Sequence, residues 1–309
     1  MPTLIKPETT FCAVPHCADM SALAADVAVI GAPHGSPYKP GTASHAAEAP
    51  AAVRRALGWY SVGAEQFDFD VMAPVMGGAR IVDCGDVPGD LSDGAGNRSR
   101  IAEAVRTTLE RGAVPLVLGG DDSVPIPMLS AYEGHGPLTI VQIDAHLDWR
   151  DEVGGERFGF SSTMRRASEM PWVERMVQIG ARGPGSARAR ELADARNWGS
   201  RVVTARDVHA RGIDPSLAHV PEGASVVLTI DVDGIDPSVV PGVILPAFGG
   251  LTYQQVLDVI HGVASRATIV GLDFVEFVPA RDPHNMGAQA IARLACNVIA
   301  MIGKQRGRT

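Results

Sequence analysis

Acidic residues and a histidine alternate immediately after an apolar run near the middle of the chain. Residues 138–143 are mostly aliphatic, and Asp144, His146 and Asp148 follow them at once. In an extended segment alternate residues face the same side, so these three side chains can converge on one point. Carboxylates gathered in this way repel one another unless a cation neutralises them. The spacing therefore predicts a metal site, although a polar turn after a strand explains this stretch equally well when it is considered alone.

A second stretch repeats the pattern and favours the metal site. Residues 226–230 are mostly apolar, and Asp231, Asp233 and Asp236 follow them. Two parallel strands could therefore deliver alternating carboxylates to the same edge of a sheet. Because a carboxylate has two oxygens, it can bind one cation with each, so the arrangement is typical of a site for two divalent ions.

The elements that would position these residues alternate along the chain. Short apolar runs predict strands near residues 27–30, 81–83, 114–118, 138–143, 176–179, 202–204, 226–230 and 269–273. Periodic patterns between or after them predict helices at 49–57, 98–111, 124–132, 187–195, 253–264 and 288–302. Such alternation predicts a mostly parallel sheet with helices on both faces. In open sheets of this kind ligands bind at the carboxyl ends of the strands, where the acidic motifs lie.

The rest of the chain indicates one domain. Residues 1–25 contain no basic segment followed by an apolar core, so we expect an N-terminal arm rather than a signal peptide or a membrane anchor. Residues 26–309 contain no repeat, linker or low-complexity segment, which favours a single domain. We also expect no membrane span, since no stretch approaches the roughly 20 apolar residues that a span requires.

Charge and cysteine usage exclude several classes of partner. The net charge is −8, the pI is about 5.6, and no run is rich in lysine and arginine, which argues against a nucleic-acid or anionic-membrane partner. The four cysteines, Cys12, Cys17, Cys84 and Cys296, follow no C-x-x-C spacing. They are typical of reduced thiols, so we expect a cytoplasmic protein.

Glycine-containing turns follow two of the expected strands. Residues 31–35 read G-A-P-H-G, and residues 119–123 read G-G-D-D-S. The two glycines of the second turn allow the backbone to turn tightly before a helix that Ser123 or Asp122 could cap. Considered alone, this turn is more typical of a strand-to-helix connection than of a ligand-binding loop.

Together, these motifs resemble those of the ureohydrolases, the family of arginase, agmatinase, related guanidino-acid hydrolases and formiminoglutamase. The similar segments are residues 119–123, 144–148, 231–237 and 271–279, in the order and with the separations typical of that family. The resemblance, which runs from about residue 26 to residue 302, implies an arginase-like three-layer α/β/α fold with a mostly parallel sheet of about eight strands. It also implies a binuclear manganese site that hydrolyses a guanidino C–N bond to urea and an amine.

The resemblance assigns roles to individual residues. For the metal ions it implies Asp144 and Asp231 as bridges, His146 and Asp233 on one ion, and Asp148 on the other. Asp148 would also accept a proton during the reaction and pass it towards the leaving amine. Glu276 would pair with the substrate guanidinium through a charge-assisted contact, the alternative being a solvated glutamate at a strand end.

Two positions depart from the family pattern. Asp122 stands where the family motif G-G-D-H-S has histidine, which would surround one ion with carboxylates only and favour a hard cation. We therefore expect two divalent ions, Mn²⁺ first and Ni²⁺ or another ion as alternatives. Phe160 stands where many members have a proton-shuttle histidine, and phenylalanine cannot transfer a proton. We expect His34, or alternatively His45, on the loop after the first strand to supply that proton, although histidines on loops are often only solvated.

The expected substrate is a small guanidino compound of the agmatine type. Residues 241–246 read P-G-V-I-L-P in place of a segment rich in glycine and threonine, so the pocket should be more apolar than usual. Alternatives are a divergent amidine or guanidino-acid hydrolase with a different metal, or a non-catalytic subunit that supports an active homologue. The clustered carboxylates disfavour the non-catalytic subunit, because burying them has a cost without a benefit there. The resemblance also implies a homo-oligomer, either a trimer or a hexamer.

Overall fold

The computed structural model describes residues 2–58, 66–184 and 187–308. Within these residues the main sheet has eight strands, all parallel, in the order β4-β1-β5-β10-β9-β6-β7-β8. The strands are β1 (Val27–Ala32), β4 (Ile81–Asp86), β5 (Val114–Gly119), β6 (Leu138–Ile143), β7 (Val173–Ala181), β8 (Arg201–Thr204), β9 (Ser225–Asp231) and β10 (Thr268–Val275). The expected parallel sheet is therefore confirmed. A small antiparallel pair, β2 (Phe67–Asp68) and β3 (Ala73–Pro74), was not expected.

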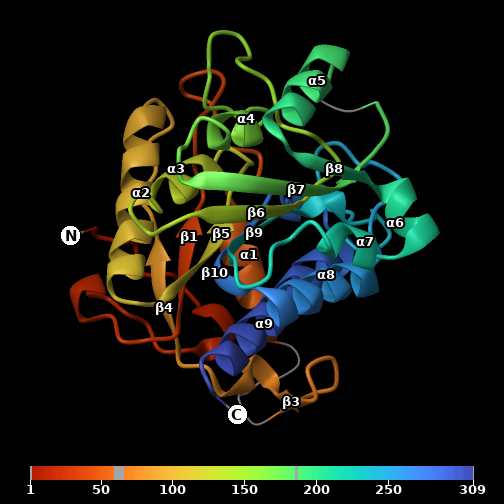
Figure 1. The fold of residues 1–309 in the computed structure, drawn as a ribbon. Coiled ribbons are helices and arrows are strands. Elements are labelled where there is room, and N and C mark those ends of the chain that lie inside the picture. Colours follow the sequence, from red (N-terminus) through yellow and green to blue (C-terminus); the bar gives the residue numbers. More distant parts are fainter. Residues whose placement is uncertain (1, 59–65, 185–186, 309) are drawn as a thin grey trace.

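Helices cover both faces of the sheet, which gives the three layers (Figure 1). The α-helices are α1 (Ala49–Arg55), α2 (Gly94–Glu110), α3 (Pro125–Ser130), α4 (Thr163–Ala167), α5 (Ala189–Trp198), α6 (Ala205–Arg211), α7 (Asp214–Leu217), α8 (Tyr253–Arg266) and α9 (Met286–Gln305). Short 3-10 turns occupy Phe11–Ala13, Met20–Ala22, Val75–Gly78, Val232–Gly234, Pro279–Arg281 and Pro283–Asn285. The six expected helices are confirmed, with shifted ends. The unexpected helices α4, α6 and α7 are too short to show a helical period.

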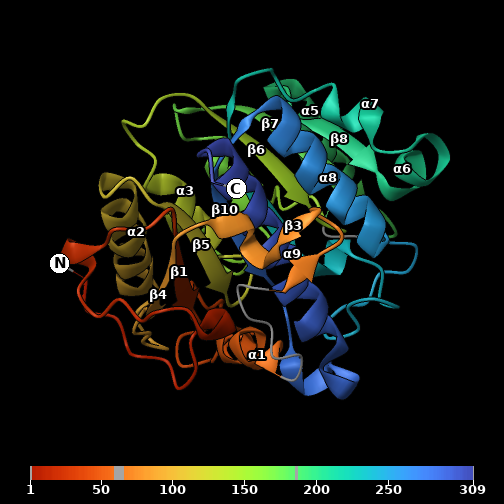
Figure 2. The same ribbon diagram turned by 90° about the horizontal axis from the view of Figure 1, so that it is seen from below.

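The core consists of two apolar layers, one on each face of the sheet. Along β1, Val27 and Val29 pack in the layer that includes α1, α8 and α9, whereas Ala28 and Ile30 pack in the layer that includes α2, α3 and α4. Figures 1 and 2 show these two groups of helices on opposite sides of the strands. Because both faces are covered, the strands are apolar at successive positions, which explains why their sequences do not alternate.

The C-terminal helix α9 is both long and apolar. The segment Pro283–Gln305 is long and apolar enough to cross a membrane by length and composition, so the expectation that no stretch reaches that range was wrong. In the structure 78% of its most apolar window is buried inside the protein, where α9 packs against α8 and the 3-10 turn Val75–Gly78. This burial is typical of a core helix.

The N-terminal arm lies along the outer strand β4. Ile5 pairs antiparallel with Asp86, and the amide of Cys17 donates to the Asp83 carbonyl over 2.9 Å. Phe11 is fully buried in the layer beside α1 and α9. The arm thus covers the edge of the sheet, which would otherwise expose unpaired backbone groups.

The sheet topology brings the acidic motifs together. Strands β10, β9 and β6 are neighbours in space although far apart in sequence. Their registers pair Ile143 with Ile230 and Val275 with Asp231, so the three strands end at the same height. The residues that follow each strand therefore meet at one carboxyl edge.

Candidate metal centre

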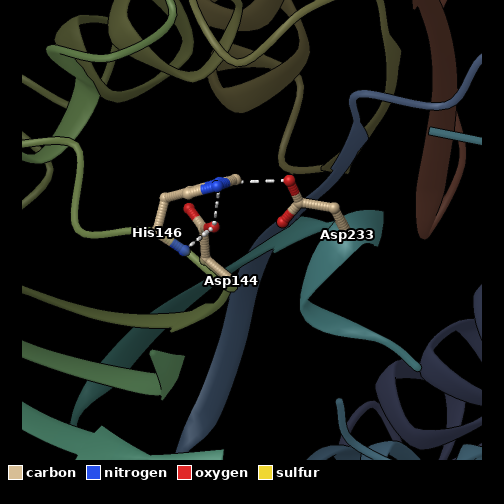
Figure 3. Close-up of side chains that lie close together, drawn as sticks. All are labelled: Asp144, His146 and Asp233. Carbon is tan, nitrogen blue, oxygen red and sulfur yellow. Dashed lines mark hydrogen bonds and ion pairs between the residues drawn. The ribbon is translucent and has the colours of Figure 1, made fainter. Parts of the chain in front are cut away.

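One group of potential metal ligands lies where β6 and β9 end. Asp144, His146 and Asp233 each offer a ligand atom, and these atoms all lie within 4.8 Å of one another. The His146 Nδ1 atom lies 3.1 Å from Asp233 Oδ2 and 3.5 Å from Asp144 Oδ1, while the His146 amide donates to Asp144 Oδ1 over 2.6 Å. Figure 3 shows the imidazole held between the two carboxylates. Two oxygens and one nitrogen converging in this way suit a divalent cation.

A second group shares a residue with the first. Asp122, Asp144 and Asp148 are all buried, and one oxygen of each lies within 4.8 Å of the others. Asp144 belongs to both groups, as a bridging ligand would; its bridging role stays a prediction. Asp231 lines a cavity together with His146 and Asp148, and its Oδ1 accepts the Asp233 amide over 2.8 Å. The bridging role of Asp231 also stays a prediction.

The carboxylate of Asp122 is buried in a position that a cation would stabilise. Among the residues that the structure describes, neither oxygen of its carboxylate has a hydrogen-bond partner, and the residue is only 1% exposed. Helix α3 begins after Val124 without a side-chain cap, so the capping role expected for Ser123 or Asp122 at this helix is not realised. A buried carboxylate without partners is costly, and a bound cation would remove that cost. Asp122 therefore fits an all-carboxylate metal site.

The acids and the imidazole of the centre perturb one another. Burial, followed by the charges of neighbouring carboxylates, raises the pKa of Asp122, Asp148 and Asp231 well above the usual range. Burial lowers the pKa of His146, but the carboxylates of Asp144 and Asp233 outweigh it and raise that pKa to about 11. A cluster of this charge must hold protons or cations. Divalent ions would replace the protons, so metal binding should be coupled to proton release.

Two residues of the site have left-handed backbones. The φ angles of Asp148 and Glu276 are 53° and 67°. Residues other than glycine seldom adopt this region, and such strain is concentrated at functional sites. Glu276 directly follows β10 and Asp148 lies in the loop after β6, and both side chains line the cavity described next.

A cavity of about 200 Å³ opens onto the acidic groups. Its wall is formed by His146, Asp148, Phe160, Ser161, Pro184, Asp231, Asp233, Ile244, Leu245 and Glu276. The wall therefore combines acidic residues with apolar ones. Ile244 and Leu245 belong to the segment 241–246, from which an apolar pocket was expected.

Glu276 lies in this cavity wall and contacts a histidine. It is 5% exposed, so it is not a solvated residue at a strand end. Its Oε1 accepts the Asp122 amide over 2.8 Å, and its Oε2 lies 2.5 Å from His45 Nε2. The His45 ring also meets Phe160 edge-on, with 5.5 Å between ring centroids. Burial raises the pKa of Glu276; Glu276 raises the pKa of His45 against the opposing effect of burial.

The structure places the two candidate proton-shuttle histidines differently. His34 lines a separate small hollow with Ser44, Asn97 and Asp121, and burial lowers its pKa. His45 contacts two residues of the cavity wall. The catalytic role expected for His34 stays a prediction, but the geometry favours His45.

Sequence reasoning missed Gln142, which lies directly behind the acids. Its side chain is fully buried and donates to Asp144 and Asp148. The only signal was a glutamine inside the aliphatic run 138–143, a position where a polar side chain needs a partner.

Comparisons with known proteins agree with this geometry. The model of the arginase family matches residues 25–301. The chain belongs to the arginase family. Enzymes of this family are ureohydrolases with two divalent metal ions, typically Mn²⁺, and the Asp and His groups described above could bind such ions.

Several relatives within the arginase family carry names of guanidino hydrolases. A guanidinobutyrase from Pseudomonas aeruginosa is 36% identical over 224 residues, which cover 67% of this chain and 70% of the relative. An agmatinase from Sodalis glossinidius is 31% identical over 284 residues, which cover 88% and 87% of the two chains. Among solved structures, a proclavaminate amidino hydrolase from Streptomyces clavuligerus superposes with a TM-score of 0.83 at 28% identity, covering 98% and 99% of the chains.

Proposed function

We propose that this member of the arginase family hydrolyses the C–N bond of a small guanidino compound and releases urea and an amine. The observation that carries the proposal is the position of Glu276, a buried carboxylate in the same cavity wall as the acidic groups. A buried carboxylate attracts a planar cation and can orient it by charge-assisted hydrogen bonds. A guanidinium held there would lie in the cavity that Asp148, Asp231 and Asp233 also line.

The residues that would hold two divalent ions are Asp122, Asp144, His146, Asp148, Asp231 and Asp233. When bound, the ions supply a water with a pKa low enough for attack on the guanidinium carbon near neutral pH. Asp148 would accept the proton of that water and pass it towards the leaving amine.

His45 would deliver a proton to the leaving amine in place of the histidine that Phe160 replaces. It contacts Glu276 and the ring of Phe160, so it lies beside the expected position of the substrate nitrogen atoms. Interaction with Glu276 raises its pKa against the opposing effect of burial, which favours the protonated form of the imidazole. The variant His45→Gln should therefore lower turnover more than His34→Gln.

Agmatine and a guanidino acid are the two candidate substrates. The cavity wall also contains the apolar side chains of Ile244 and Leu245, which suit an alkyl chain. Arg281 favours an acidic tail, because its Nη1 donates to the carbonyls of Val243 over 3.3 Å and Ile244 over 2.8 Å and so places a cation behind this wall. The relative named guanidinobutyrase also supports a guanidino acid as the substrate.

Cytoplasmic location and homo-oligomeric assembly stay predictions of the sequence.

The experiment is urea release by the Mn²⁺-loaded protein from agmatine, 4-guanidinobutyrate and arginine. We expect urea from at least one of the first two compounds. Glu276→Gln should mainly raise KM, since it weakens the contact with the guanidinium, while the exposed Glu174→Gln should change nothing. Absence of urea from every guanidino compound, with metal bound, would refute the proposal.

A further inference from the structure

A chain of buried polar side chains lies behind the acids. Gln142 on β6 and Gln178 on β7 are register partners in neighbouring strands, and they are 0% and 1% exposed. The Gln178 Nε2 group donates to Gln142 Oε1 over 2.6 Å, and Trp149 Nε1 donates to Gln178 Oε1 over 2.9 Å. Two amides facing each other inside an aliphatic sheet are stable only when their hydrogen bonds are made.

This series of hydrogen bonds ends at two acids of the candidate metal centre, Asp144 and Asp148. Gln142 Nε2 donates to Asp144 Oδ2 over 2.6 Å and to Asp148 Oδ2 over 3.2 Å. One amide group therefore contacts an oxygen of each carboxylate. This double contact fixes the rotation of the two carboxylates relative to one another, and it places a donor between two groups that would otherwise repel.

Trp149, at the end away from the acids, sets the donor-to-acceptor direction of each hydrogen bond in this series. The indole of Trp149 can only donate, so Gln178 must turn its oxygen towards it. The hydroxyl of Ser200 donates to the same oxygen over 2.8 Å. The Gln178 amino group is then left to donate to the Leu147 carbonyl and to Gln142. Gln142 must consequently accept from Gln178 and turn its own amino group towards the acids.

We propose that Trp149, Gln178 and Gln142 form a positioning chain that orients Asp144 and Asp148 for metal binding. The donor-only indole sets the orientation of the first amide, the first amide sets the second, and the second holds the carboxylates. The inference rests on the metal centre of the proposed function. Its consequence is confined to the group Asp122, Asp144 and Asp148, because Gln142 contacts two of these three acids.

The direct test is Mn²⁺ titration of Gln142→Met, a variant of similar length without the donor. Partners of metal-binding side chains typically change affinity by about 10–100-fold when they are lost, so one of two Mn²⁺ ions should bind that much more weakly. The matched control is Thr229→Val. Thr229 is the register partner of Gln142 on β9, and its hydroxyl donates over 2.9 Å to Asp273, an acid outside both metal groups.

Thermal unfolding in chelator separates positioning from simple loss of stability. Gln142→Met and Thr229→Val each lose a buried donor to a carboxylate, so both should unfold at lower temperature than the wild type. Only Gln142→Met should lose Mn²⁺ affinity. If both ions bind Gln142→Met within twofold of their wild-type affinities, the positioning chain is refuted.

A second pair of variants tests the far end of the chain and covers the case in which Gln142→Met does not fold. Trp149→Phe removes the donor that sets the direction of the bonds and should weaken the same ion. Trp172→Phe removes an indole that donates to the Leu129 carbonyl over 3.0 Å, away from the centre, and should not weaken it. Equal Mn²⁺ affinities in these two variants would contradict the proposal.

Two bound ions without urea release would refute the proposed function but leave the positioning chain intact. A wild-type protein that binds no divalent ion would refute both.

Discussion

Replacing Asp122 by asparagine should have opposite effects on the metal-free and the metal-loaded protein. The Asp122 carboxylate is buried beside Asp144 and Asp148 and has no hydrogen-bond partner among the described residues. A buried polar group without a partner costs about 1–3 kcal/mol, and more when it is charged. Asparagine has the same shape, carries no charge and adds a donor that can face the neighbouring acids. The metal-free Asp122→Asn variant should therefore be more stable by about 1–3 kcal/mol.

The expected shift can be measured by thermal unfolding. One kcal/mol corresponds to roughly 2–4 °C for domains of about 150–250 residues and to somewhat less for a longer chain, so the midpoint in chelator should rise by a few degrees. Burial raises the pKa of Asp122, so keeping this side chain neutral in the metal-free wild type becomes harder as the pH rises. The gain in midpoint should therefore be larger at about pH 8 than at about pH 5.

With Mn²⁺ present, the sign should reverse. Asp122→Asn loses a charged ligand, so elemental analysis should find fewer metal ions per chain than in the wild type, and the stabilisation by Mn²⁺ should shrink. The neighbouring Asp121→Asn is the control, because the Asp121 side chain accepts from Ser123 and lies outside the metal groups. A wild-type metal ratio together with an unchanged midpoint in chelator would refute the assignment of Asp122 as a ligand.

Three further predictions follow from the same geometry. Asp148→Asn should lower turnover by roughly 10²–10⁴-fold with little change in KM, since a proton acceptor is lost, and near-normal turnover would exclude that role. Asp231→Ala should empty at least one metal position and lower the midpoint in Mn²⁺; full occupancy by elemental analysis would rule out a bridge. The pKa of His146 is raised to about 11 in the folded protein. Protonated His146 therefore contributes its full stabilisation below its unfolded-state pKa, and this contribution is lost as the pH rises towards the folded-state pKa. The midpoint of the metal-free protein should thus fall between about pH 7 and pH 9 in the wild type but less in His146→Asn, and parallel curves would contradict the ion pair.

Strand positions and the acidic ends of the strands could be predicted because both are local properties of the sequence. Residues 138–143 and 226–230 are apolar since both faces of the sheet are covered, and the acids after them mark the carboxyl edge. The order of the strands in the sheet could not be predicted from local sequence patterns. It required the pairing of β10 with β9 and of β9 with β6, segments that are widely separated in sequence.

Contacts between distant loops could not be predicted in the same way. His45 reaches Glu276 across 231 positions of sequence, and neither residue has a pattern that indicates the other. Residues of the arm gave no signal that Phe11 would be fully buried, because a single aromatic residue has no periodicity. Gln142 was visible only as a polar residue in an apolar strand, and its partners depend on the neighbouring strand β7.

The most direct test of the central claim is urea release measured as a function of bound metal per chain. Metal-free protein should be loaded stepwise with Mn²⁺, with bound metal determined by elemental analysis and urea measured from agmatine and 4-guanidinobutyrate in the same samples. The two acidic groups that share Asp144 predict that urea release rises as the second ion binds and disappears in chelator. Full activity in chelator, or two bound ions without urea from any guanidino compound, would contradict the account.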